Sequence, residues 1–144
     1  MGYFLRGFRN HRLTRENLVQ LMENKLIAVG EYNKIFDSYL SYKISQKTIY
    51  QSPGLAKHIL KRHPECLQYM DMIPSILSSP DYIGINPNES GVSFELVKIL
   101  SENVQIGIKL DSKADYLYVA TLHTITEAKL RHGISNGRLK KFDK

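Results

Sequence analysis

VSFELVKIL, residues 92–100, opens the part of this 144-residue chain that decides its fold class, and VQIGIKL (104–110) and YLYVATLHTI (116–125) continue it. Each segment is rich in Val, Ile, Tyr and Thr and alternates with a period of two, which is typical of strands with one buried face. Short polar loops separate the segments. We therefore predict an antiparallel meander of three strands, and YIGI (82–85) adds a fourth strand before it.

The short loops also allow the strand register to be estimated. We expect Leu100 to face Val104 and Leu110 to face Tyr116. One face of the sheet then carries the side chains that pack against the helices, namely Phe94, Leu96, Ile106, Ile108, Tyr118 and Ala120. In this register Tyr116 and Tyr118 are interpreted as core residues rather than as base-stacking side chains.

The opposite face of the sheet mixes charged, polar and apolar side chains. In the expected register Glu95 lies directly opposite Lys109, and Thr121 lies on the same face. One interpretation is a half-exposed face with a single cross-strand ion pair. The other is the floor of a groove, in which Gly107 lets a ligand approach the backbone. A register slipped by one residue would bring Lys98 to this face instead.

The first third of the chain has a helical pattern. Apolar residues recur at helical spacing from about residue 14, and Gly30 is expected to end this helix. A second helix is predicted over about 31–43 from a stripe of aromatic and aliphatic residues. Two helices joined so closely also match a DNA-reading helix-turn-helix. We expect residues 1–45 to form an N-terminal helical extension and residues 46–144 to form the main domain, within one compact unit.

The segment SPGLAKHILKRHP (52–64) predicts a short amphipathic helix. Its opening Ser-Pro pair suits an N-cap and the first helical position, and its final Pro ends the helix. On a helical wheel His63 falls within the apolar stripe, whereas His58 and Arg62 lie one turn apart on its flank. We expect His63 to pack and His58 to border a site. A further short helix is expected in CLQYMDMIPSIL (66–77).

Composition limits the class of protein. Twenty Lys and Arg against fourteen Asp and Glu give a net charge of +6, which favours polyanionic partners. The single cysteine, Cys66, excludes an intramolecular disulfide, and no Cys/His spacing of the zinc-binding kind occurs, so we expect no metal or other cofactor. No run of about 18 apolar residues is present. We therefore expect no membrane association and a cytoplasmic location.

Six segments in sequence order carry a family resemblance: SPGLAKHILKRHP, PDYIG, FELVK, IGIKLD, YLYVATLHTI and SNGRLKK. They resemble the phage-type Barnase-EndoU-colicin-RelE-like nuclease domains that occur in phage and mobile-element proteins. The resemblance covers roughly residues 48–141, about two thirds of the chain. It implies an α+β fold in which N-terminal helices pack on a four-stranded antiparallel sheet.

The resemblance further implies metal-independent RNA cleavage, in which a ribose 2'-hydroxyl attacks the adjacent phosphate and leaves a cyclic phosphate end. This reaction needs a base, an acid and cations that stabilise the charge on the phosphorane. His58 matches the family's helix histidine and can serve as acid or base, and Glu95 is a second possible base. Lys109 and Arg138 can hold phosphate, and Thr121 can donate a hydrogen bond to it.

Four further residues are expected to contact the substrate: Arg62, His63, Lys98 and His123. Of these, His123 lies on the Thr121 face and can supply the second histidine of a catalytic pair. A nuclease of toxin or phage-effector type predicts RNA, including tRNA, as substrate and a neutralising antitoxin or immunity protein as partner. Two rival functions stay open: a non-catalytic RNA- or protein-binding member of the same fold, and a DNA-binding regulator that uses the N-terminal helices.

Overall fold

Seven strands form one mixed sheet in the order β1-β2-β6-β5-β4-β3-β7. The computed structural model describes residues 26–52 and 54–143. The strands are β1 (Ile27–Glu31), β2 (Thr48–Gln51), β3 (Tyr82–Gly84), β4 (Ser93–Ile99), β5 (Asn103–Asp111), β6 (Tyr116–Ile125) and β7 (Leu139–Lys141). Neighbouring strands are antiparallel except for β2 and β6, which run parallel. The predicted α+β class is confirmed, but the four predicted strands are part of a larger, mixed sheet.

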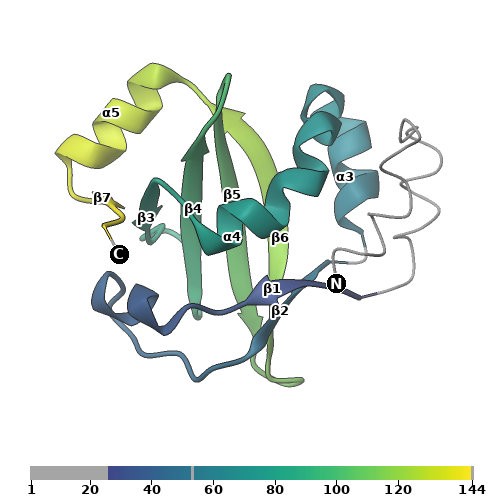
Figure 1. Cartoon of the computed structure of the whole chain (residues 1–144), viewed down its shortest axis with the longest axis vertical. Coiled ribbons are helices and arrows are strands. Elements are labelled where there is room, and N and C mark those ends of the chain that lie inside the picture. Colours follow the sequence, from purple (N-terminus) through teal and green to yellow (C-terminus); the bar gives the residue numbers. More distant parts are fainter. Residues whose placement is uncertain (1–25, 53, 144) are drawn as a thin grey trace.

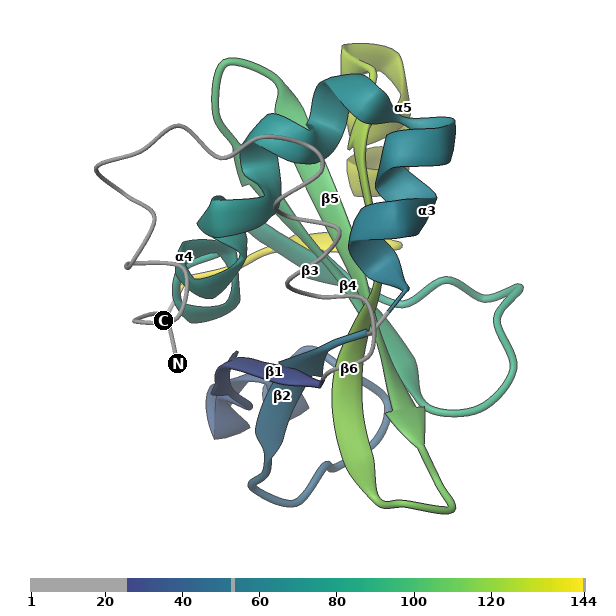
Figure 2. The same cartoon turned by 90° about the vertical axis from the view of Figure 1, so that its right-hand side faces the viewer.

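Helices lie on both faces of this sheet (Figure 1). They are the 3-10 helices η1 (Lys34–Ser38) and η2 (Pro64–Met72) and the α-helices α3 (Leu55–Arg62), α4 (Ile73–Ser78) and α5 (Glu127–Ser135). Buried residues of η1, α3, η2 and α4 join the main core on one face, which we call the inner face. On the opposite, outer face, Leu130 of α5 clusters with Val97 and Leu139. Figure 2 shows the β3–β4 loop standing out from the sheet on the side away from α4.

The inner face carries the apolar positions that were predicted for β4 and β5. Phe94, Leu96, Ile106 and Ile108 are fully buried there. Phe94 also packs edge-to-face against the ring of Tyr32, at a centroid distance of 5.7 Å. The alternation of these two strands therefore predicted their buried face correctly.

The register between β4 and β5 differs from the predicted one by two residues. Glu95 pairs with Gly107, and Lys109 pairs with Ser93. The predicted placement of Glu95 opposite Lys109 is therefore wrong. Because a shift of two residues keeps each side chain on its own face, both Glu95 and Lys109 still lie on the outer face.

The β6 strand contains a bulge that reverses part of its alternation. Gly107 pairs with Thr121, whereas the next residue of β5 pairs with Val119, so Ala120 is an extra residue in β6. Val119 consequently points into the core and is fully buried. Tyr118 faces outward, so the predicted core positions of Tyr118 and Ala120 are wrong. Thr121, beyond the bulge, lies on the predicted outer face.

The predicted helices near the N-terminus are wrong where the structure describes them. Residues 27–31 form β1, and residues 31–43 contain only the short helix η1. Phe36 packs edge-to-face on Phe142, at 5.3 Å, so the aromatic residues serve the core without a long helix. The helix-turn-helix interpretation thereby loses its second helix. Residues 1–25 lie outside the described part. The boundary expected after residue 45 stays a prediction. The strand before it, β1, joins the common sheet.

Asp37 stabilises the segment that follows β1 through hydrogen bonds. Its carboxylate accepts hydrogen bonds from the Tyr32 hydroxyl at 2.6 Å, the Lys34 Nζ at 2.7 Å and the Ile44 backbone N–H at 3.1 Å. Burial by itself would raise the pKa of Asp37, but these hydrogen bonds outweigh it and lower the pKa to about 2. The charged form of Asp37 is therefore stabilised by the folded state.

We expect Asp37→Asn to lower the free energy of unfolding by about 2 kcal/mol at neutral pH, because three donors lose a charged acceptor. The folded pKa lies below the ordinary value of 3.8, so the carboxylate stabilises the fold fully above about pH 4 and loses this effect as the pH falls towards 2. Urea unfolding of both proteins at several pH values measures this. A difference between them that does not shrink in acid would contradict the assignment.

No helix in residues 26–52 and 54–143 is long and apolar enough to cross a membrane.

Candidate functional site

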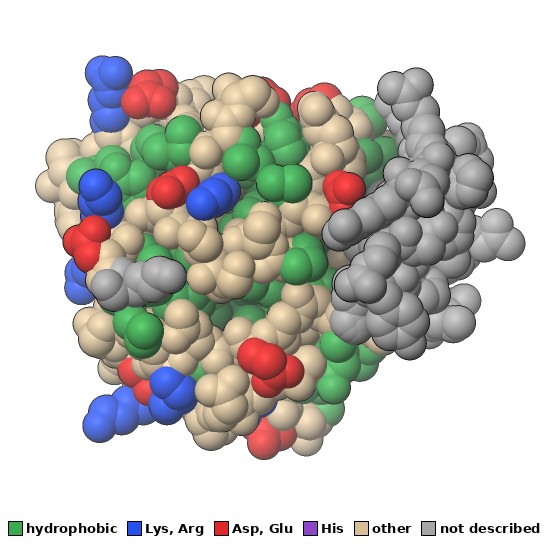
Figure 3. Space-filling model, viewed as in Figure 1, with side chains coloured by type: hydrophobic (Ala, Val, Ile, Leu, Met, Phe, Trp, Pro, Cys, Tyr) green, Lys and Arg blue, Asp and Glu red, His purple; other side chains and the backbone are tan. Residues whose placement is uncertain are grey.

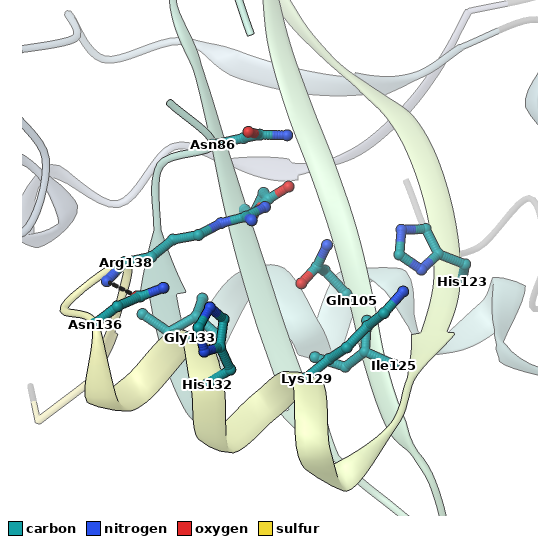
Figure 4. A pocket seen from close by; sticks show the side chains of 11 residues that line it. Asn86, Gln105, His123, Ile125, Lys129, His132, Gly133, Asn136 and Arg138 are labelled. Atoms are coloured by element: carbon teal, nitrogen blue, oxygen red, sulfur yellow. Dashed lines mark hydrogen bonds and ion pairs between the residues drawn. The ribbon is translucent and has the colours of Figure 1, made fainter. Parts of the chain in front are cut away.

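A pocket of about 390 Å³ opens on the outer face, between the sheet and α5. Its floor is formed by Glu95 of β4, Gln105 of β5 and His123 of β6. Figure 4 shows side chains from α5, and from the turn after it, extending over these strands. Figure 3 shows the other side of the molecule, where none of the visible described side chains is a histidine and where Lys and Arg side chains are scattered. The pocket thus gathers titratable groups on the outer face.

The floor is ordered in rows across three strands. Glu95, Gly107 and Thr121 form one row, and His123 pairs with Gln105 in the next. Because neighbouring strands are about 4.8 Å apart, the Cα atoms of Glu95 and Thr121 lie about 10 Å from one another. Between them, a Cβ at Gly107 would lie 2.6 Å from the Thr121 Oγ1. Because Gly107 has no side chain, there is room for the Thr121 hydroxyl beside it. The floor between Glu95 and Thr121 therefore stays open.

The wall of the pocket comes from α5. Lys129, His132 and Asn136 line the pocket and recur at intervals of three and four residues, which places them on one face of the helix. The Asn136 side chain then accepts a hydrogen bond from the Arg138 backbone N–H at 2.9 Å. In Figure 4 the side chain of Arg138 extends from this turn across the pocket.

Arg138 and Glu95 form an ion pair inside the pocket. The Arg138 Nη2 donates to the Glu95 Oε1 over 2.6 Å, and the two side chains are 35% and 13% exposed. The carboxylate thus lies at the floor and the guanidinium nearer the mouth. Within the described part of the chain this is the one hydrogen bond of the guanidinium, so its other N–H groups can hold a phosphate.

The backbone at Gly84 positions Arg138. The β3 and β7 strands pair so closely that a Cβ built on Gly84 would overlap the Arg138 carbonyl oxygen. Any side chain at this position must push β7, and with it Arg138, away from the sheet.

We expect Gly84→Ala to lower the free energy of unfolding by about 2 kcal/mol, because the backbone oxygen cannot move without disrupting the β3–β7 pairing. Gly54→Ala is the matched control, because a Cβ at Gly54 meets nothing within 4 Å. Urea unfolding of both variants measures the difference. Equal stability of the two variants would show that the close approach at Gly84 has no cost.

Lys109 lies at the edge of the site. It lines a smaller pocket of about 40 Å³ together with Glu95, Gly107 and Thr121. Its Nζ is 3.1 Å from the Glu89 Oε1 of the β3–β4 loop. Lys109 therefore belongs to the same groove as Glu95, although Arg138 and not Lys109 is the partner of that carboxylate.

Three imidazole rings lead from α3 to the pocket. The His123 and His63 centroids are 6.1 Å apart, and those of His63 and His58 are 6.3 Å apart. His123 lines the pocket, His63 is half-buried at the end of α3, and His58 is exposed, like Arg62. The His123 Nδ1 lies 3.1 Å from the Thr124 carbonyl oxygen. Because a carbonyl only accepts, this contact places a proton on Nδ1 and leaves Nε2 for other partners.

Lys98 lies away from the groove. Its Nζ donates to the Ser79 carbonyl oxygen at 2.7 Å and is 4.0 Å from the Asp81 carboxylate. In the ladder it pairs with Val104, an inner-face residue. The register that would bring Lys98 to the Glu95 face is therefore wrong.

Sequence reasoning missed the wall of the pocket, because it did not predict α5. Local signals were present: the Thr126 side chain accepts a hydrogen bond from the Lys129 N–H as an N-cap, and Gly137 lies just past the helix end. Recognising this helix would have placed Lys129, His132 and Asn136 on one face. The described residues contain no group of three or more His, Cys, Asp or Glu side chains that could hold a metal ion.

Comparison with known families agrees with the resemblance noted in the sequence. A family model described as "phage-Barnase-EndoU-ColicinE5/D-RelE like nuclease3" matches residues 27–132, from β1 into α5. The chain belongs to this family. The matched part includes Glu95, Thr121 and His123, whereas Arg138 follows its end. No curated protein and no solved structure matched the chain. Membership identifies a nuclease-type domain whose expected substrate is nucleic acid.

Proposed function

We propose that this nuclease-family domain is an RNA endonuclease that cleaves by directing a ribose 2'-hydroxyl at the adjacent phosphate, without a metal ion. One observation carries the proposal: a single pocket holds a carboxylate, two imidazoles, a guanidinium and an ammonium group, from Glu95, His123, His132, Arg138 and Lys129. These groups include the base, the acid and the cations that the reaction needs.

Glu95 and His123 are the groups to which we assign proton transfer. Glu95 lies at the pocket floor beside Arg138, so its carboxylate is placed to serve as base for the 2'-hydroxyl. His123 stands two strands away, on the other side of β5. In an in-line attack the entering and leaving oxygens lie on opposite sides of phosphorus, so a group on each side is required. In this role His123 acts as the imidazolium, which donates its Nε2 proton to the leaving oxygen and keeps its Nδ1 proton hydrogen-bonded to the Thr124 carbonyl oxygen.

The remaining groups stabilise charge on the phosphorane. Arg138 lies against Glu95 and can hold two phosphate oxygens through a planar fork. Lys129 reaches towards the His123 side of the pocket in Figure 4 and can neutralise the leaving side. Thr121, beside Gly107, can donate its hydroxyl to a phosphate oxygen. For Lys109, at the groove edge, we propose contact with the neighbouring phosphate rather than with the reacting one.

The test is cleavage of labelled single-stranded RNA and of total tRNA by the purified chain in EDTA, with mapping of the product ends. We expect 2',3'-cyclic phosphate ends. Product ends with a simple 3'-phosphate from the start, or cleavage that appears only when a divalent metal is added, would contradict the mechanism.

A non-catalytic nucleic-acid-binding role is the second candidate. The observation that favours it is the 2.6 Å contact between Glu95 and Arg138, which would also serve as a purely structural ion pair. This role predicts RNA that is retained on a filter with the protein but stays intact. If the domain is instead a toxin that acts on tRNA in the cytoplasm, a neutralising protein would cover the wall of the pocket, with its cations Lys129 and Arg138.

A further inference from the structure

Three tyrosine side chains stand together on the outer face, beyond the pocket. Tyr50 of β2 and Tyr116 of β6 pack edge-to-face at a centroid distance of 5.6 Å, and Tyr116 and Tyr118 do so at 6.0 Å. Tyr50 and Tyr118 are also direct neighbours across the parallel β2–β6 pair. These three residues form one continuous aromatic surface, which we call the tyrosine platform.

The platform is not part of the hydrophobic core. Its three side chains are half-buried, and none of them joins either of the hydrophobic clusters found among the described residues. The sequence-based prediction that Tyr116 and Tyr118 belong to the core is therefore wrong. The bulge at Ala120 explains the difference, because it turns Leu117 and Val119 inward and the tyrosines outward.

The hydroxyl groups of the platform also differ from those of buried tyrosines. The hydroxyls of Tyr32 and Tyr69 are hydrogen-bonded to carboxylates at 2.6 Å. For the platform hydroxyls no hydrogen bond is found to any residue in 26–52 or 54–143. These rings thus keep part of their aromatic area, and their hydroxyl groups, outside the hydrophobic core.

Lys109 connects the platform to the pocket. It pairs with Tyr118 across β5 and β6, and it lines the small pocket beside Glu95 and Thr121. At about 3.3 Å per residue, Tyr118 lies about 10 Å along β6 from Thr121. If an RNA strand has one phosphate held between Glu95 and Thr121, the nucleotides next to that phosphate reach the tyrosine platform. The backbone of the RNA then passes Lys109.

We propose that the tyrosine platform binds the unpaired bases next to the scissile phosphate, so that the substrate is single-stranded over this stretch. The inference rests on the proposed function and adds a subsite to it. Aromatic rings beside a cationic groove are the arrangement that stacks unpaired bases of any identity. A duplex hides the faces of its bases, so the platform selects single-stranded RNA with little preference for base sequence.

The experiment measures binding apart from cleavage. A labelled single-stranded 2'-O-methyl RNA has no free 2'-hydroxyl to attack, so its dissociation constant reports binding alone; a duplex of the same sequence is the comparison. We expect Tyr116→Ala and Tyr118→Ala each to weaken single-strand binding about 10-fold, since stacking contributes about 5- to 150-fold per base. Tyr116→Phe and Tyr118→Phe keep the ring and are expected to bind like wild type. Duplex affinity should not change.

Wild-type single-strand affinity in both alanine variants would overturn the proposal, and so would an equal loss of single-strand and duplex affinity. A dimer that dissociates on Tyr116→Ala would overturn it in favour of a self-association surface. If the alanine variants fail to fold, tyrosine emission of the wild type decides, because the chain contains no tryptophan. Quenching is expected when the single strand saturates the protein, and its absence would contradict stacking.

The same measurements separate this proposal from the proposed function. Platform-dependent binding without any RNA cleavage would leave the tyrosine subsite standing and reject the nuclease activity. Cleavage with cyclic phosphate ends, together with RNA binding that the alanine substitutions do not weaken, would support the nuclease activity and reject the tyrosine subsite.

Discussion

Replacing His123 with alanine is expected to lower the rate constant of RNA cleavage by about 10²- to 10⁴-fold, the usual effect of removing a general acid. His123 is the imidazole on the pocket floor, and its Nδ1 contact with the Thr124 carbonyl oxygen leaves Nε2 for the leaving oxygen. RNA affinity should change only a few-fold, because Arg138 and Lys129 remain. Single-turnover kinetics with saturating protein measure the chemical step separately from binding.

His58→Ala is the matched control and also tests the rival assignment. The family resemblance predicted that His58, on α3, serves as acid or base. His58 is exposed. Its ring contacts His63, and His63 in turn contacts His123, so His58 lies at the end of the row away from the pocket. From its position we expect a rate within a few-fold of wild type. A large loss in His58→Ala with a normal rate in His123→Ala would move the catalytic role to α3.

The second large effect is expected at the Glu95–Arg138 pair. Glu95→Gln removes the proposed base, and Arg138→Met removes the cation that we propose holds the phosphate. We expect each to lower the cleavage rate by about 10²- to 10³-fold. Because the two side chains touch, at 2.6 Å, their effects should not add, and the double variant should lose less than the product of the single losses.

Two further variants test this second prediction. Arg138→Lys keeps the charge but loses the planar fork, so we expect an intermediate rate. Lys98→Met is the matched control, because Lys98 lies on β4 near Glu95 but is bonded to the Ser79 carbonyl oxygen on the other side. Normal cleavage by both Glu95→Gln and Arg138→Met would mean that the reaction takes place elsewhere. A loss in Lys98→Met equal to theirs would indicate a general loss of structure.

The strands of the second half of the chain were predictable, because their side chains alternate. The register was less so: Ile99 pairs with Asn103, so the turn begins one residue earlier than predicted, and Leu100 lies within it with its N–H donating to the Glu102 carbonyl oxygen. The bulge in β6 carries no local signal, since its extra residue is Ala120 rather than a glycine. That one residue decides whether Tyr118 belongs to the core or to the surface.

Residues of the floor and Arg138 stood out in the sequence, whereas the rest of the wall and the contacts between the residues did not. Glu95, Thr121, His123 and Arg138 all stood out by their chemistry or by the family resemblance, and the structure gathers them on the outer face. The Glu95–Arg138 contact, however, joins residues 43 positions apart. It depends on the β3–β7 pairing at Gly84, which no local pattern encodes. Strand β1 was likewise missed, because residues 26–43 match a helical period as well as a strand, and β2 (Thr48–Gln51) is only four residues long.

The most direct test of the account is cleavage of one RNA oligonucleotide before and after a single 2'-deoxy substitution at the nucleotide whose 2'-hydroxyl would attack. Wild-type protein should cut the all-ribose strand at that position and leave the deoxy strand intact there, while binding both with similar affinity. Equal cleavage of the two strands at that position would show that the 2'-hydroxyl is not the nucleophile, and it would contradict the assignment of Glu95 and His123 to its activation.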